Sequence, residues 1–348
     1  MAKSPLSEPV RVKLSRPGDM AAAIPHLVGF QPQESLVVVS LHGKRVGLTM
    51  RFDLTPARYD SELAEQIAVR LVADRAESAL LAVCTEEVPA DGPHPRHDLI
   101  ERLDRALRQR GIDLLDALLI RAGRWWSYRC DDPSCCPADG AEIPPGIDIA
   151  AAHALMGRSP LPSRAALQEQ IKPLEFVARR SMQQALDDAD EAFAAAVVEL
   201  GFEPVRDALV AFFKELTDRY ADPHTAALTD DEAARVIVGL HDVHTRDRVL
   251  AAALDHELDA AQALFLELCR RAIPPDDPPT CTLLAGIAYA EGNGALANVA
   301  LERALASDPS YSLARLFSDA LYQQVPPSLM RRAWKDAEKK RTRSPRGH

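Results

Sequence analysis

Residues 36–52, LVVVSLHGKRVGLTMRF, decide the fold class of the chain. They contain two short runs rich in β-branched and other apolar residues, 36–40 and 46–52, with Gly43 between them. Such runs have the composition of strands, and glycine adopts the positive φ that a tight turn requires. The stretch therefore predicts a β-hairpin at the start of a sheet.

After the hairpin, the sequence alternates between helix-like and strand-like patterns. The predicted elements are helix, strand, helix, strand and an aromatic strand, at residues 61–75, 79–83, 98–110, 114–120 and 125–128. The order β-β-α-β-α-β-β predicts an α/β sandwich with a mixed sheet.

From residue 163 onward, strand patterns almost disappear, and alanine-rich and leucine-rich segments at helical spacing continue to the C-terminus. Ser163 is placed to be the N-cap of one helix, and Gly201 ends another. Thr229 and Glu232 have the spacing of a capping box, in which each side chain bonds the other residue's backbone N–H. We therefore expect an all-α second domain.

Residues 278–311 resemble a single tetratricopeptide repeat, with Gly292 and Gly294 in its turn. Small and apolar residues occupy the packing positions of the repeat: Leu284, Ala285, Ala297, Leu301 and Ala304. Ala288 departs from the pattern, because a large aromatic residue usually stands there. The alternative is an ordinary helix hairpin, and one repeat cannot form the concave peptide groove that about three repeats make.

The composition is that of a globular protein, since 47% of the 348 residues are hydrophobic and 26% are charged. These values exclude collagen-like, wholly disordered and small disulfide-bonded folds, and the length suggests two domains. The patterns place an α/β domain at 18–150 and a helical domain at 151–330. An N-terminal extension, 1–17, precedes them, and a C-terminal tail, 331–348, follows.

The formal net charge of −10 is unevenly distributed. Residues 1–130 carry 18 Lys and Arg against 17 Asp and Glu, residues 131–330 carry 15 against 32, and residues 331–348 carry 8 against 2. An acidic surface disfavours nucleic acid, because phosphate binding requires basic side chains. Nucleic acid is therefore expected only through the basic tail, unless the tail folds against the acidic helical domain.

The sequence also predicts a location. The first residues lack the apolar stretch of a signal peptide, and no run reaches the ~18 apolar residues that a membrane helix needs. We therefore expect a cytoplasmic protein with no membrane partner. In that reducing compartment the six cysteines are expected to be buried, metal-binding or redox-active.

Residues 124–140, RWWSYRCDDPSCCPADG, contain two of the three tryptophans and three of the six cysteines. The thiolates could bind zinc, with His153 as the nearest downstream histidine, or could form a redox pair beside Arg124 and Arg129. They could also pack as small apolar side chains against the tryptophans. The residues singled out are Trp125, Trp126, Tyr128, Cys130, Cys135 and Cys136.

Residues 24–35 lead into the first strand and are expected to form a ligand or interaction loop. The residues singled out are Pro25, Gly29, Phe30, Pro32 and Ser35. A catalytic site would need Ser35, His26 and Glu34 within hydrogen-bond reach of one another. The alternative is that His26 and Phe30 cap the sheet and Ser35 satisfies a turn.

Residues 25–54 and 124–140 together resemble the actinobacterial domain-of-unknown-function family 4192, of which ALERALASDPSYSLARL, residues 300–316, is also typical. The resemblance covers nearly the whole chain. It implies an N-terminal α/β region and a helical C-terminal region, and it supplies no activity, substrate or cofactor.

No Walker A, GxGxxG, HExxH or GxSxG motif occurs in the sequence. We expect a non-catalytic protein-interaction or regulatory module, with the Trp/Cys loop and the acidic helical surface as contact sites. The alternative is an enzyme that uses Cys130, Cys135 and Cys136 as metal ligands or redox thiols. Zinc is the one cofactor that these residues suggest.

Overall fold

The computed structural model describes residues 14, 16–88, 94–130, 132–134, 136–155, 159–222, 224–255 and 258–343. Its internal contacts divide the chain into two units, residues 1–164 and 165–348. The first unit thus extends beyond residue 150, where the sequence patterns placed the end of the α/β domain. Most of the expected N-terminal extension lies outside the described residues.

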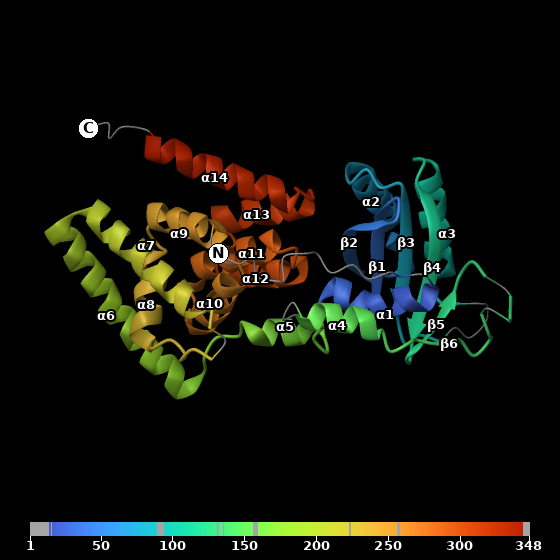
Figure 1. The fold of residues 1–348 in the computed structure, drawn as a ribbon, viewed down its shortest axis with the longest axis horizontal. Helices are drawn as coiled ribbons and strands as arrows, with labels where there is room; N and C mark the ends of the chain where they lie inside the picture. The colour runs from blue at the N-terminus through green and yellow to red at the C-terminus, as the bar shows by residue number, and fades with distance from the viewer. Residues whose placement is uncertain are drawn as a thin grey trace, which may run out of the picture. The chain divides into compact units, whose positions relative to one another are not determined.

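The first unit is built on a mixed sheet, as predicted. Within the described residues, six strands are aligned in the order β2-β1-β3-β4-β5-β6 (Figure 1). β3 and β4 are parallel, and the other neighbouring pairs are antiparallel. The strands are β1 (Ser35–His42), β2 (Arg45–Asp53), β3 (Ser78–Cys84), β4 (Asp113–Arg121), β5 (Arg124–Ser127) and β6 (Ala141–Glu142). β6 was not predicted, because two residues are too few to show a pattern.

Helices cover both faces of this sheet, which confirms the α/β sandwich. α2 (Asp60–Ala73) and α3 (His97–Arg108) pack on one face, in a core that includes Leu36, Leu81 and Trp126. The alternating residues of each strand supply this core, because successive side chains point to opposite faces. A short 3-10 turn, η1 (Ala57–Tyr59), precedes α2.

α1 (Pro17–Val28) lies on the opposite face of the sheet, against β2, β4 and β5. A Cβ added to Gly18 would lie 3.0 Å from the indole Nε1 of Trp125. Trp125 therefore faces α1, whereas the next residue, Trp126, faces α2 and α3. α4 (Ile147–Leu155) packs against α1 and belongs to the same unit.

The structure corrects the loop expected at residues 24–35, because its first part is the last turn of α1. Pro25 lies inside that helix. Proline inside a helix removes a backbone hydrogen bond, which is why this residue favoured a loop in the sequence. The stronger signals were Pro17 in the first turn and Gly29 at the end, where φ is 87°.

The second unit is helical, as predicted. Its described helices are α5 (Arg164–Gln170), α6 (Phe176–Leu200), α7 (Phe202–Arg219), α8 (Asp230–Gly239), α9 (Val243–Asp255), α10 (Leu258–Arg271), α11 (Asp277–Ala290), α12 (Gly294–Ser307), α13 (Ser312–Tyr322) and α14 (Pro327–Arg343). The predicted capping box is present, since Glu232 N–H donates to Thr229 Oγ1 at 3.2 Å and Thr229 N–H donates to Glu232 Oε2 at 2.9 Å. No described helix has the length and apolar character needed to cross a membrane.

α11 and α12 form a packed helix pair that covers most of residues 278–311. The residues assigned to packing positions are all buried: Leu284, Ala285, Ala297, Leu301 and Ala304. Gly292 lies in the turn between the helices, with a φ of 83°. The segment is a helix hairpin, and its likeness to a tetratricopeptide repeat stays a prediction.

α14 covers most of the expected basic tail, of which residues 344–348 lie outside the described part of the chain. The ring of Trp334 lies against that of Phe317, with 5.4 Å between the centroids. The helix also contacts α9 and α11. The first part of the tail is therefore docked on its own helical unit.

Candidate functional site

The end of the expected N-terminal loop joins two distant segments of the first unit. Phe30 pairs with Leu161 in a short parallel bridge. The N–H of Gln31 donates to the carbonyl of Leu161 at 2.8 Å, and the N–H of Leu161 donates to the carbonyl of Gly29 at 2.9 Å. This bridge explains why the first unit extends past residue 150.

Ser35 is buried at the start of β1, and Pro32 is buried just before it. The Ser35 hydroxyl donates to the carbonyl of Gln33 at 2.5 Å and accepts a hydrogen bond from Arg51 Nε at 2.8 Å. Arg51 also pairs with Asp53, at 2.6 Å. The hydroxyl is thus engaged by a backbone carbonyl and a cation, whereas a nucleophilic serine needs a general base beside it.

Trp126 fastens the segment after the cysteine loop to the sheet. Its indole N–H donates to the carbonyl of Ala138 at 3.0 Å. Gly140 lies directly against the ring, where an added Cβ would lie 2.4 Å from it, and has a φ of 77°. The guanidinium of Arg121 covers the ring at 4.9 Å from its centroid. The contacts of Trp126 therefore hold the backbone of residues 138–140 against the sheet.

Tyr128 holds the turn that precedes α3. Its hydroxyl donates to the carbonyl of Pro95 at 2.6 Å, and burial raises its pKa. The ring of His94 lies 5.4 Å from that of Tyr128 and 6.4 Å from that of Trp126. Since Trp125 points to the other face of the sheet, the three aromatic residues of the motif do not converge on one ligand.

The sheet places Cys84, a cysteine outside the predicted loop, beside Ser35. The two residues are paired in register at the carboxyl end of β3, an edge where α/β proteins often bind ligands. Burial raises the pKa of the Cys84 thiol to about 12. The thiolate is the reactive form of cysteine, so this thiol is a poor nucleophile at neutral pH.

The predicted cysteine loop is described only in part, because Cys135 lies outside the described residues. Cys130 and Cys136 are half-buried, and the N–H of Cys136 donates to the carbonyl of Asp132 at 2.7 Å. Zinc binding by this loop stays a prediction. The structure places His153, its proposed fourth ligand, with its ring 5.0 Å from the ring of His26.

In the described part of the chain, one group of three side chains brings possible metal-binding atoms close together. It consists of His97, Asp98 and Glu101 in the first turns of α3, and both acidic residues are exposed. Exposed acidic groups of this kind are common without a metal ion.

The acidic helical surface, the other expected contact site, contains a groove between α6 and the start of α8. Its volume is about 550 Å³. Three aspartates and one arginine give its lining a negative charge. The lining residues are Val177, Arg180, Ser181, Gln184, Ala185, Asp188, Asp230 and Asp231.

α6 leaves most of its surface uncovered. All 25 of its residues are described, and only three of them are buried. Near its start, Phe176 is 87% exposed and Val177 is 82% exposed. Near its end, Val198 is 89% exposed and Leu200 is also exposed. Adjacent apolar side chains in water mark a contact surface more often than single ones do.

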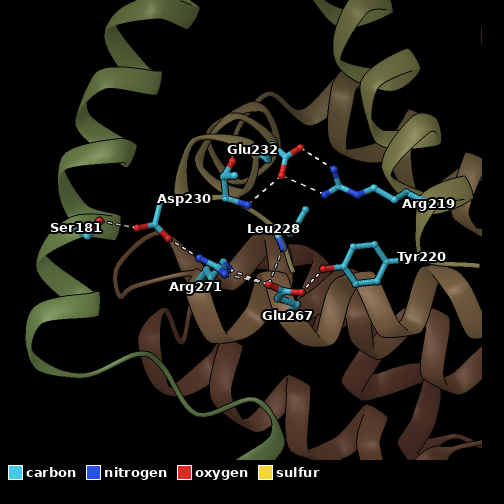
Figure 2. A network of polar contacts seen from close by, with 9 residues as sticks. Ser181, Arg219, Tyr220, Leu228, Asp230, Glu232, Glu267 and Arg271 are labelled. Carbon is cyan, nitrogen blue, oxygen red and sulfur yellow. Dashed lines mark hydrogen bonds and ion pairs between the residues drawn. The ribbon is translucent and has the colours of Figure 1, made fainter. Parts of the chain in front are cut away.

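A polar network fixes one wall of the groove to the unit (Figure 2). The Ser181 hydroxyl donates to Asp230 Oδ2 at 2.6 Å, and Arg271 bonds both Asp230 and Glu267. The hydroxyl of Tyr220 donates to the other oxygen of Glu267. Burial and this carboxylate together raise the pKa of Tyr220. The network thus links α6, α8 and α10 by charge-assisted hydrogen bonds.

Glu232, at the start of α8, is the second anchor of this wall. Arg219 donates to its two carboxylate oxygens at 2.8 and 3.1 Å, as Figure 2 shows. The hydrogen bonds from Arg219 lower the pKa of Glu232 to about 2. Most charges of the network are therefore mutually satisfied, which suits a rigid wall better than acid–base chemistry.

The sequence indicates an acidic helical surface but does not indicate that α6 is its exposed part. The sequence does contain one signal of this surface. Apolar residues stand at both ends of an acidic helix, at 176–177 and at 198 and 200. Such residues are normally assigned to a core, so the sequence alone could not show that they are exposed.

A helix-covered mixed sheet followed by a helical unit defines the class of this chain as a two-part α/β and all-α protein. Residues 17–328 match the model of the family described as Domain of unknown function (DUF4192), so the chain belongs to that family. The family named from the sequence resemblance is thereby confirmed. No curated protein matches the chain, and no solved structure matches it.

Proposed function

We propose that this protein is a non-catalytic interaction module that binds a basic segment of a partner protein in the groove between α6 and α8. One observation carries the proposal. The large apolar residues at both ends of α6 are exposed on a helix whose other exposed residues are alanines and polar residues, with more acidic than basic side chains. Exposed apolar residues beside charged ones, as at each end of this helix, are typical of a protein contact surface.

Charge complementarity favours a basic partner. The lining of the groove carries three aspartates against one arginine, and the whole segment 131–330 is strongly acidic. Opposite charges steer two proteins together and exclude partners of the wrong sign. A helix or extended segment with lysines or arginines between apolar anchors fits this surface.

The polar network supports binding in a second way. Ser181 and Asp230 of the lining are already held by hydrogen bonds, and Glu232 is held beside them, so this wall does not have to be ordered when a partner arrives. A preorganised surface loses less conformational entropy on binding. We place this interaction in the cytoplasm, the compartment proposed from the sequence.

Photo-crosslinking in the native host tests the proposal. A photoreactive amino acid at position 177 is expected to form a discrete adduct with a partner protein. The matched control is position 69 on α2, which is also an exposed valine, at 54%. The proposal fails if position 177 gives no adduct or gives the same adducts as position 69.

Charge reversal tests the electrostatic part. Asp188→Lys combined with Asp231→Lys is expected to reduce the adduct at position 177 by about tenfold or more, as loss of a central contact does. The control pair, Glu62→Lys with Asp113→Lys, makes the same charge change on exposed residues of the α/β unit. Equal adduct yields from the two double variants would remove the basic-partner assignment.

A further inference from the structure

We propose that His26 and His153 form a binding site for a transition-metal ion of the zinc type, on the α1 face of the sheet. His26 lies in the last turn of α1 and His153 in the last turn of α4. The two helices pack against each other, which brings together histidines that lie far apart in the sequence. The site is independent of the proposed interaction groove, because it belongs to the other unit.

The geometry of the two rings fits a shared ion. Their centroids are 5.0 Å apart, and their planes are tilted by 59°. Zinc–nitrogen bonds of about 2.0–2.1 Å in a tetrahedral site place the centroids of two imidazole ligands about 5 Å apart. The observed separation of the centroids matches this value.

The hydrogen bonding of His26 supports the assignment. Its Nδ1 is buried and has no hydrogen-bond partner among the described residues. A buried acceptor or donor without a partner costs free energy, which a bound ion at that nitrogen would recover.

The ligand chemistry selects the class of ion. Imidazole nitrogens favour Zn²⁺, Cu²⁺ and Ni²⁺, whereas Mg²⁺ and Ca²⁺ favour oxygen ligands. Two protein ligands leave coordination positions for water or a small anion. α1 also meets the residue just before α4, since a Cβ on Gly146 would lie 3.1 Å from that of Ala22, so the two helices are in close contact on this face.

Calorimetric titration of the metal-stripped full chain with Zn²⁺ tests the site. The wild type is expected to bind one ion that His26→Ala and His153→Ala each weaken by about tenfold or more, as loss of a ligand does. Two controls address the other possible sites: His97→Ala, and Cys130→Ser combined with Cys136→Ser. Both controls are expected to leave this binding event unchanged. Binding that survives both histidine variants, or that is lost only in a control, overturns the assignment.

A spectroscopic measurement on the wild type tests the site even if an alanine variant does not fold. Cu²⁺ bound to the stripped protein is expected to show two imidazole nitrogens in its electron paramagnetic resonance spectrum. A conservative variant, His153→Gln, is expected to show one. A spectrum without nitrogen ligands, or no binding of Cu²⁺ at all, contradicts the proposal.

Discussion

α2 and α6 show two ways in which a helix can be held to a domain. α2 buries six of its 14 residues, most of them in the apolar core of the sheet. α6 is longer but buries only three of 25, and a hydrogen bond from Ser181 to Asp230 helps to attach it. The difference teaches that α2 is held mainly by apolar burial, beside one buried ion pair of Asp60 with Arg96, whereas α6 leaves most of its surface uncovered.

Removing the polar contacts of Arg303 is the test of this comparison with the largest expected effect. Its Nε donates to the fully buried Asp277 at 2.9 Å, and its other nitrogens donate to the carbonyls of Cys269 and Ala272 at 2.7 and 2.6 Å. Arg303→Ala is expected to destabilise the helical unit by about 3–5 kcal/mol, because it leaves a buried carboxylate without its partner. Urea denaturation followed by circular dichroism measures this loss.

The control for this variant is Arg270→Ala, which removes an exposed arginine from α10. It is expected to change stability by less than about 0.5 kcal/mol. Similar losses in the two variants would mean that the polar contacts of Arg303 do not stabilise the helical unit.

Gly140 tests the packing of the α/β unit. A methyl group there would overlap the ring of Trp126, and φ is in the left-handed region. Gly140→Ala is expected to cost about 2–4 kcal/mol, from overpacking together with backbone strain. Gly123→Ala is the matched control, because its φ is 74° but no atom lies within reach of the added Cβ. A loss for Gly140→Ala no larger than that of the control would contradict the packing role.

The ion pair of Glu232 with Arg219 makes the stability of the helical unit depend on pH. The folded-state pKa of Glu232, about 2, lies below its usual value of 4.5, so its ion pair stabilises the fold above about pH 4.5 and is lost as the pH falls toward 2. Glu232→Gln is expected to cost about 1 kcal/mol at neutral pH and to flatten the decline of stability in this acidic range. Unfolding midpoints measured across that range check the result, with Glu215→Gln, an exposed glutamate of α7, as the control.

Val198 provides the smallest expected effect on stability. Because its side chain is almost fully exposed, Val198→Ser is expected to change the free energy of unfolding by less than about 0.5 kcal/mol. The same substitution is expected to reduce the partner adduct at position 177. A clear loss of stability would show that α6 serves the core after all, as α2 does.

The sequence predicted β1 to β5 of the sheet because each of these strands leaves its own local pattern. β1, β3 and β4 are apolar runs of a length that strands prefer, and α2 and α3 have helical spacing. α1 was missed because Pro25 outweighed the helix signals on either side of it. Local patterns thus identify an element unless one residue, such as Pro25 in a helix, has the opposite structural preference to the residues around it.

The candidate sites were less predictable, because they depend on contacts between distant segments. The ion pairs of Arg271 with Asp230 and of Arg303 with Asp277 join different helices, and no spacing in the sequence indicates them. The sequence suggests His153 as a metal ligand, but it suggests its neighbour His26 only for a catalytic site or for a cap on the sheet. Only the packing of α4 on α1 reveals that the two rings meet.

The bridge between Phe30 and Leu161 has a consequence for dissecting the chain. A recombinant fragment cut at residue 150 would discard Leu161 and leave the backbone of Gly29 and Gln31 without two of its hydrogen bonds. It would also cut α4 soon after its start. The shortest fragment that preserves the α/β unit intact therefore ends beyond Leu161, close to Arg164.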